Sequence, residues 1–281
     1  MEKNAYSCSP DELRGMAKTG FALFETKEPL YESFAGQILD EIERGNAEGR
    51  PTPLILPVGP KGQYPIFIRE VNRRRISLKN LHAFMMDEYL DWQGRPLPPG
   101  HPLSFCGYIE GVFAEIDAEL RPPTEQIYFP DPCEIDRYSE RLAALGGPDA
   151  CFGGIGSHGH VAFNEPPNHR LLRVSDEEFA ASLTRIVPLN AETIVLNSIR
   201  ANGGNYGDFP VMAVTVGMAD IFSSKKIRLF CDGGAWQRFV LRTALFGEPS
   251  CDYPVTLLQK HPDIVIHADR STAQPPESQL P

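Results

Sequence analysis

A glycine-rich segment at residues 153–166 holds the residue types that catalyse proton transfer. Its sequence is Gly-Gly-Ile-Gly-Ser-His-Gly-His-Val-Ala-Phe-Asn-Glu-Pro. Histidine and glutamate are the usual acid–base pair near neutral pH, and glycines let backbone amides approach a ligand closely. The segment predicts a ligand-binding turn in which His160 and Glu165 face one another and Gly156 contacts the ligand. A purely structural hydrogen-bonded pair is the alternative.

A second candidate base follows another apolar run. Residues 81–86 are mainly apolar and end in Asp87 and Glu88. Adjacent residues of a strand point to opposite sides, so at most one of the two carboxylates enters a shared crevice. Asp87 is the predicted catalytic base, and a solvated turn is the alternative interpretation of the pair.

The two histidines of the glycine-rich segment also suit a metal ion. His158 and His160 form an H-x-H pair, and with Glu165 and Asp87 they are ligand types for a divalent transition metal. The spacing lacks a recognised third and fourth ligand, so we expect no metal and no other cofactor. A divalent metal ion at His158, His160 and Glu165 stays open as the alternative.

Cationic side chains and a further turn are candidates for binding an anionic group of a substrate. The turn Gly59-Pro60-Lys61-Gly62 offers a lysine but lacks the spacing of a P-loop. Arg200 and Arg238 are isolated cations. The predicted substrate-binding residues are Gly59, Lys61, Gly62, Gly156, Arg200 and Arg238.

The hydrophobic pattern predicts strands that alternate with helices. Runs typical of buried strands lie at 54–56, 81–86, 126–129, 150–152, 183–188, 211–216, 226–231 and 263–267. Helices are predicted at 30–43, 64–73, 103–118, 133–145 and 235–245, with a polar break at 45–50. This alternation predicts an α/β protein with a mostly parallel sheet covered on both faces, a three-layer Rossmann-like fold in a single domain.

Such a sheet predicts where the site lies. Ligands of parallel sheets bind beyond the carboxyl ends of the strands. Polar turns follow predicted strands at 57–62, 87–89 and 153–165, and we expect them to converge on one crevice. The domain is expected to span 30–268, after an N-terminal extension at 1–29 and before a flexible, proline-rich tail at 269–281.

Composition excludes several classes of partner. The net charge of the 281 residues is −10 and the pI is about 5.2, which disfavours nucleic acid and anionic membranes. The chain has neither a run of 18 apolar residues nor an apolar signal core. Its six cysteines lack CxxC spacing, which indicates reduced thiols in a cytoplasm-like compartment. We therefore expect a cytoplasmic protein with a small-molecule ligand.

Three segments together resemble one known family. The segment at 153–166 looks like the signature of glucosamine-6-phosphate deaminases, also called isomerases. Met-Asp-Glu-Tyr at 86–89 resembles their other catalytic segment, and Val-Thr-Val-Gly-Met at 214–218 resembles their late strand and turn. The resemblance covers roughly residues 30–268. The Phe-Asn-Glu-Pro match favours this branch over the related 6-phosphogluconolactonases, which share the fold.

The resemblance implies a reaction and its residues. The family converts an aldose amino-sugar phosphate into a ketose phosphate and ammonia without a cofactor. His160, supported by Glu165, would open the sugar ring, and Asp87 would move a proton between C2 and C1. The ligand would be a sugar or sugar phosphate, and a homo-oligomer is expected.

The sequence departs from the family pattern at several positions. His158 stands where the family has an aspartate that completes the relay with the histidine and the glutamate. The turn at 59–62 replaces a Gly-Gly-Thr-Pro type of phosphate-binding turn, and its proline removes one amide donor. The family's phosphate-binding arginine aligns with Ile199, beside Arg200, and its lysine aligns near Gln237, beside Arg238.

These departures predict a divergent member that acts on a related sugar, with a different anionic group or none. Two alternatives stay open. One is a sugar-phosphate-binding protein without turnover, and the other is a lactonase-like sugar hydrolase with His160 as its base.

Overall fold

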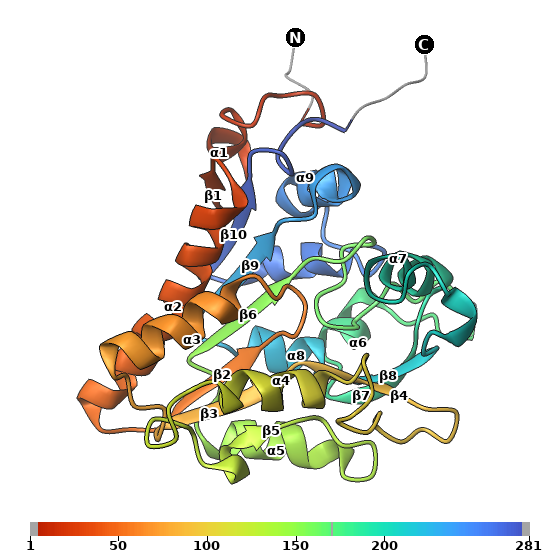
Figure 1. Cartoon of the computed structure of the whole chain (residues 1–281). Helices are drawn as coiled ribbons and strands as arrows, with labels where there is room; N and C mark the ends of the chain where they lie inside the picture. Colours follow the sequence, from red (N-terminus) through yellow and green to blue (C-terminus); the bar gives the residue numbers. More distant parts are fainter. Residues whose placement is uncertain (1–4, 170, 277–281) are drawn as a thin grey trace.

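A parallel sheet of seven strands forms the centre of the molecule (Figure 1). The computed structural model describes residues 5–169 and 171–276. Every neighbouring pair in the order β1-β10-β9-β6-β2-β3-β5 is parallel. The strands are β1 (Gly20–Phe24), β2 (Thr52–Leu56), β3 (Leu81–Met85), β5 (Ile127–Tyr128), β6 (Ala150–Gly154), β9 (Ile227–Cys231) and β10 (Ile264–Asp269).

Helices cover both faces of this sheet, as expected for a three-layer α/β fold. Leu54 and Leu56 of β2 pack in one core with the apolar faces of α2, α3 and α4, whereas Ile55 packs in the other with α5, α8 and α9. This alternation is the two-residue period of a strand. The helices of these two layers are α2 (Lys27–Glu48), α3 (Gln63–Arg74), α4 (Phe105–Ala114), α5 (Ile135–Ala144), α8 (Met218–Phe222) and α9 (Arg238–Phe246).

A second, smaller sheet lies beside the first and is antiparallel. Its order is β4-β8-β7, with β4 (Asp87–Leu90), β8 (Met212–Thr215) and β7 (Arg185–Pro188). The predicted turn at 87–89 is wrong, because the chain leaves the parallel sheet at Met86 and pairs at once with β8. The runs at 183–188 and 211–216 are strands as predicted, but they belong to this antiparallel sheet.

Four α-helices of the described residues were not predicted from the pattern. They are α1 (Leu13–Met16), α6 (Asp176–Ala180), α7 (Ala191–Ala201) and α8. The predicted polar break at 45–50 is also wrong, since α2 continues to Glu48. Gly45 lies inside the helix where a Cβ would lie 1.8 Å from Thr52 Oγ1, so the glycine permits close packing on β2. Gly49 ends the helix in the left-handed conformation, with φ of 63°.

The first and last described segments pack on the main sheet and on α9. β1 is an edge strand of the sheet, although it lies within the expected extension at 1–29. Thr272 and Ala273 are fully buried, so the expected tail begins as packed chain. Residues 277–281 of that tail lie outside the described residues, and the domain boundaries stay a prediction.

Two further expectations concern the cysteines and the absence of membrane-spanning helices. All six cysteines lie in the described residues and are free thiols. Within residues 5–169 and 171–276, no helix combines the length and the apolar character needed to cross a membrane.

Candidate active site

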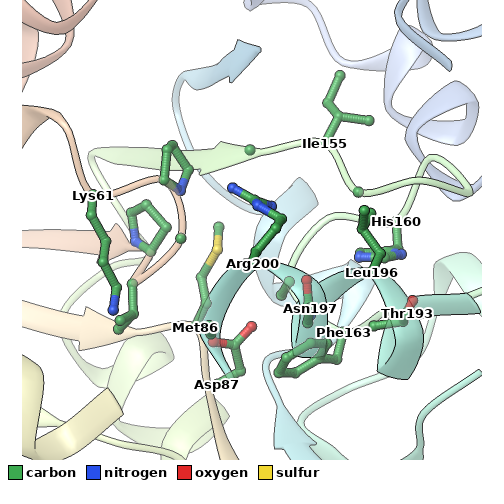
Figure 2. Close-up of a pocket in the computed structure, with 18 of the residues that line it drawn as sticks. Lys61, Met86, Asp87, Ile155, His160, Phe163, Thr193, Leu196, Asn197 and Arg200 are labelled. Carbon is green, nitrogen blue, oxygen red and sulfur yellow. The ribbon is translucent and has the colours of Figure 1, made fainter. Parts of the chain in front are cut away.

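A cavity of about 440 Å³ opens beyond the carboxyl ends of β2, β3, β6 and β9. Its lining includes the turn at 57–62, Met86 and Asp87, and residues 154–157, 160, 162 and 163. The structure therefore brings the three predicted segments to one crevice, although 87–89 is a strand and not a turn. Helix α7 closes another side with Thr193, Leu196, Asn197 and Arg200 (Figure 2).

His160 is held against the backbone of its own turn. A Cβ on Gly156 would lie 1.8 Å from His160 Nε2, so only glycine fits there. The amide of Gly156 donates to the carbonyl of His160 at 2.9 Å, and Gly159 adopts φ of 76°. Gly156 lines the cavity, which is compatible with its predicted contact with a ligand. The space beside its Cα, however, is filled by the imidazole of His160.

Asn164 of the same segment anchors the turn to the small sheet. Its side-chain amide donates to the carbonyls of Val161 and Val216 at 3.0 and 2.8 Å. Its oxygen accepts from Arg185 on β7 at 2.8 Å. Asn164 is fully buried. Its hydrogen bonds hold the Phe-Asn-Glu-Pro part of the segment in place and thereby fix the position of the next residue, Glu165.

Glu165 lies beside His160 and at the start of α7. Its Oε1 is 3.9 Å from His160 Nδ1, which is an electrostatic contact longer than a hydrogen bond. Its Oε2 accepts from the amide of Asn190, the residue that caps α7. His160 Nδ1 and Glu165 Oε1 are both buried and have no hydrogen-bond partner. A small rotation of either side chain would join them.

Burial sets the protonation of this pair. Desolvation, with the neighbouring His158, lowers the pKa of His160 from 6.5 to about 3. Desolvation raises the pKa of Glu165 from 4.5 to about 7, against hydrogen bonds that lower it. The imidazole is therefore neutral near pH 7, and the carboxyl group titrates in the same pH range.

The side chains of Asp87 and Glu88 point to opposite sides, as those of adjacent strand residues do. Asp87 lines the cavity, and burial together with the charge of Glu88 raises the pKa of Asp87 well above its ordinary value. Glu88 is not among the lining residues and faces α4 instead. It accepts from the amides of Phe105 and Cys106 at 3.0 and 2.8 Å and from the hydroxyl of Ser104 at 3.1 Å. Glu88 thus caps a helix, while Asp87 is free for chemistry.

His158 faces α7 and is not among the residues that line the cavity. Its Nε2 lies 3.7 Å from Glu192 Oε2, and its ring centroid lies 6.0 Å from that of His160. No group of three or more histidine, cysteine, aspartate or glutamate side chains among the described residues is arranged to hold a metal ion. The open metal alternative therefore has no support from the geometry.

The predicted anion-binding residues separate into two groups. Gly59, Lys61, Gly62 and Arg200 line the cavity, and the guanidinium of Arg200 lies 5.3 Å from the ring of Trp236. Ile199 is 62% exposed, so the arginine one position later takes the place inside the cavity. Arg238 is not in the lining, because its Nε donates to the carbonyl of Ser271 at 3.2 Å.

Sequence reasoning missed the contribution of α7 and of the chain after β9. Thr193, Leu196, Asn197 and Arg200 are spaced as one helical face, and Asn190 is a typical N-cap residue, so a helix with a polar inner face could have been found. Asp232, Trp236 and Tyr31 also line the cavity. No local pattern marks these three as neighbours.

Comparison with known proteins places the chain among sugar-phosphate enzymes. No protein-family profile matches it. A glucosamine-6-phosphate deaminase of Parabacteroides distasonis is 30% identical over 256 residues, which cover 87% of this chain and 88% of that protein. One of Porphyromonas gingivalis is 31% identical over 257 residues, covering 87% and 90%.

Solved structures agree with these relatives. A monomeric glucosamine-6-phosphate deaminase superposes with a TM-score of 0.76 at 26% identity, covering 91% of this chain and 99% of that one. The 6-phosphogluconolactonase of Trypanosoma brucei shares the fold, with a TM-score of 0.64 at 20% identity over 92% of this chain and 98% of its own. The relatives at 30% and 31% identity, each matched over most of its length, show that the chain belongs to the glucosamine-6-phosphate deaminase family of the NagB superfamily.

Proposed function

We propose that the chain is an aldose–ketose isomerase and deaminase that acts on an amino-sugar phosphate of the glucosamine 6-phosphate type or on a related amino sugar. One observation carries the proposal. Asp87 and His160 line the same cavity, and Glu165 lies directly behind the imidazole. A cavity of about 440 Å³ has the size of a small-molecule site.

Ring opening is the first step of the proposed reaction. Neutral His160 accepts the proton of the hydroxyl at C1 and returns it to the ring oxygen as the C1–O5 bond breaks. The product is the open-chain aldehyde. Glu165 stabilises the transient imidazolium, because its carboxylate lies 3.9 Å from Nδ1. This role needs the ionised form of Glu165.

Proton transfer between carbons is the second step. The Asp87 carboxylate removes the proton from C2 while the substrate ammonium group gives a proton to O1, which yields an enol-type intermediate with a neutral amino group, and Asp87 then returns its proton to C1. The nitrogen at C2 is then an iminium group, which water attacks, and ammonia leaves with the ketose as the other product. The raised pKa of Asp87 supports this assignment, because it makes the carboxylate a stronger base.

Release of ammonia and ketose tests the proposal. Purified protein would be assayed with glucosamine 6-phosphate and with glucosamine, and we expect both products from at least one of them. Asp87→Asn should lower kcat by about 10²–10⁴-fold, the usual contribution of a general base. Asp252→Asn, an exposed aspartate outside the cavity, is the matched control.

Two results would contradict the proposal. One is the absence of ammonia and ketose with both sugars, although the sugars stabilise the protein against heat. That result would indicate a binding protein without turnover. The other is hydrolysis of sugar lactones at a rate that Asp87→Asn leaves unchanged, which would indicate a hydrolase with His160 as its base.

A further inference from the structure

One wall of the cavity carries a carboxylate where an anion-binding site would need cations. We call it the Asp232 wall, and it consists of Tyr31, Arg200, Asp232, Trp236 and Gln237. Asp232 follows β9, and its Oδ2 accepts from the hydroxyl of Tyr31 at 2.5 Å. This hydrogen bond fixes the carboxylate at the cavity surface.

Close backbone contacts hold this wall in place. A Cβ on Gly62 would lie 2.4 Å from the Tyr31 ring, so that ring rests on the turn before α3. A Cβ on Gly233 would likewise lie 2.4 Å from the Trp236 ring. Tyr31 and Trp236 are therefore packed tightly against backbone, and the hydrogen bond from Tyr31 holds the Asp232 carboxylate.

The side chain of Gln237 is held by the backbone at both polar atoms. Its Nε2 donates to the carbonyl of Ile155 at 2.6 Å, and its Oε1 accepts from the amide of Gly233 at 2.6 Å. Pro60 has no N–H to offer. Gln237 is uncharged, so it does not supply the positive charge that a lysine ammonium would give a phosphate ligand.

The two cations of the cavity are held by different aromatic rings, although burial and the charge of Arg200 together lower the pKa of Lys61. The Lys61 ammonium lies 4.1 Å from the ring centroid of Tyr108, and the Arg200 guanidinium stacks on Trp236. The two groups point in different directions (Figure 2). At the wall, burial and the hydrogen bond to Asp232 raise the pKa of Tyr31 while the charge of Arg200 lowers it, so charges of both signs lie near this ring. A phosphate dianion bound by Arg200 would also meet the Asp232 carboxylate, and two like charges in a partly buried site repel strongly.

We infer that the Asp232 wall selects an amino sugar whose end distant from the reacting carbons carries an uncharged hydroxyl group rather than a phosphate. This inference rests on the proposed function, since it names the substrate of the same site. Asp232 accepts a hydrogen bond from the hydroxyl, Arg200 donates to the hydroxyl oxygen, and Trp236 offers an apolar face. A carboxylate with a neighbouring aromatic ring suits a hydroxylated ligand, because each hydroxyl is both donor and acceptor.

Binding of unreactive ligands tests this selection. The probes are 2-amino-2-deoxyglucitol and its 6-phosphate, which have no aldehyde and cannot be turned over. Calorimetric titration at pH 8, where a phosphate monoester is mostly a dianion with a second pKa of about 6, gives both Kd values. We expect the wild-type protein to bind the unphosphorylated ligand at least as tightly as its phosphate.

Asp232→Asn is the decisive variant, because it removes the charge and keeps the shape. It should change the ratio of the two Kd values by about tenfold or more in favour of the phosphate, which corresponds to about 1.4 kcal/mol. Tyr31→Phe, which releases the carboxylate but keeps the ring, should weaken binding of the unphosphorylated ligand. Asp252→Asn should change neither Kd.

Three results would overturn the inference. They are tenfold tighter binding of the phosphate by the wild-type protein, an unchanged ratio in Asp232→Asn, and no binding of either ligand. Failure of the proposed function is a separate result, since it is the absence of ammonia and ketose in the turnover assay. The ligands used here report on recognition alone.

Discussion

At the scale of single residues, Glu165 connects the chemistry of the cavity to the fold around it. One carboxylate oxygen accepts from the amide of Asn190, and the other lies 3.9 Å from His160 Nδ1 without a hydrogen bond. Burial raises the pKa of Glu165 to about 7. The folded protein thus holds the proton of Glu165 more tightly than the unfolded chain does, and this difference makes both stability and activity depend on pH.

Stability should fall as the pH rises through the titration of Glu165. The pKa of the group is 4.5 in its ordinary state and about 7 in the fold. Its contribution is therefore fully present below pH 4.5 and is lost as the pH rises to about 7, with a total of about 3 kcal/mol. Glu165→Gln should flatten the pH dependence in this window. Urea unfolding at several pH values measures the free energy of unfolding as a function of pH. The same pH dependence in Glu165→Gln and the wild-type protein would contradict the prediction.

The catalytic activity should rise with pH over the range in which the stability falls. The ionised carboxylate is the form that stabilises protonated His160, so kcat/KM for the amino-sugar substrate should rise with an inflection near pH 7. Glu165→Gln should lower kcat and remove this inflection. A Glu165→Gln profile that keeps the inflection would assign it to another group. Glu177→Gln, at an exposed glutamate outside the cavity, is the matched control.

Sequence reasoning predicted the residues of one local segment better than those brought together from distant parts of the chain. His160 and Glu165 lie five positions apart in one turn, so residue types and spacing suffice to pair them. Tyr31, Asp232 and Trp236 come from α2 and from the chain after β9. They meet only because the strand order brings these segments to the same edge, and no periodicity in the sequence encodes that order.

At the scale of elements, α7 has the inverse of the usual amphipathic pattern. Val195 and Ile199 are 45% and 62% exposed, whereas Thr193 and Asn197 face the cavity. A helix is normally found from an apolar face that packs on the core. The inner face of α7 lines a cavity instead, so the hydrophobic pattern did not reveal it, while the strands and helices of the main sheet followed their patterns except at β1 and α8.

Glu88 fixes another element, the start of α4, by capping it from the neighbouring strand. Its carboxylate is 1% exposed and accepts from the amides of Phe105 and Cys106. Glu88→Gln replaces one carboxylate oxygen, an acceptor, with an NH2 group that faces the N–H donors of Phe105 and Cys106. We expect the free energy of unfolding to fall by about 1–3 kcal/mol, the cost of an unsatisfied buried group. Urea denaturation measures it.

The control for this prediction is Glu110→Gln, on the exposed side of the same helix. It should change the free energy of unfolding by less than about 0.5 kcal/mol, as surface substitutions usually do. Equal stability of Glu88→Gln and the wild-type protein would mean that the hydrogen bonds from Phe105 and Cys106 add nothing to the stability of α4.

At the scale of the whole molecule, Arg242 holds the two ends of the chain against α9. Its side chain is fully buried. Its guanidinium donates to the carbonyls of Ala5 and Cys8 at 2.7 and 2.9 Å and to the carbonyl of Ala273 at 2.8 Å. Backbone carbonyls of the first and the last described segments thus accept hydrogen bonds from the same guanidinium group. The expected division into an extension, a domain and a tail misses this connection, because a hydrogen bond between residues more than two hundred positions apart leaves no sequence pattern.

Arg242→Met should therefore loosen both ends of the chain together. The substitution introduces an apolar side chain of similar length and leaves the buried carbonyls of Cys8 and Ala273 without their donor, at about 1–3 kcal/mol each where no water replaces it. We expect the free energy of unfolding to fall by several kcal/mol and limited trypsin digestion to cleave first near Arg14 and Lys18, while these sites stay protected in the wild-type protein. Arg69→Met, which changes an exposed arginine on α3, should alter neither. If Arg242→Met unfolds at the wild-type urea concentration and resists cleavage at the N-terminal sites, the packing of β1 alone holds the first segment, and the guanidinium is dispensable.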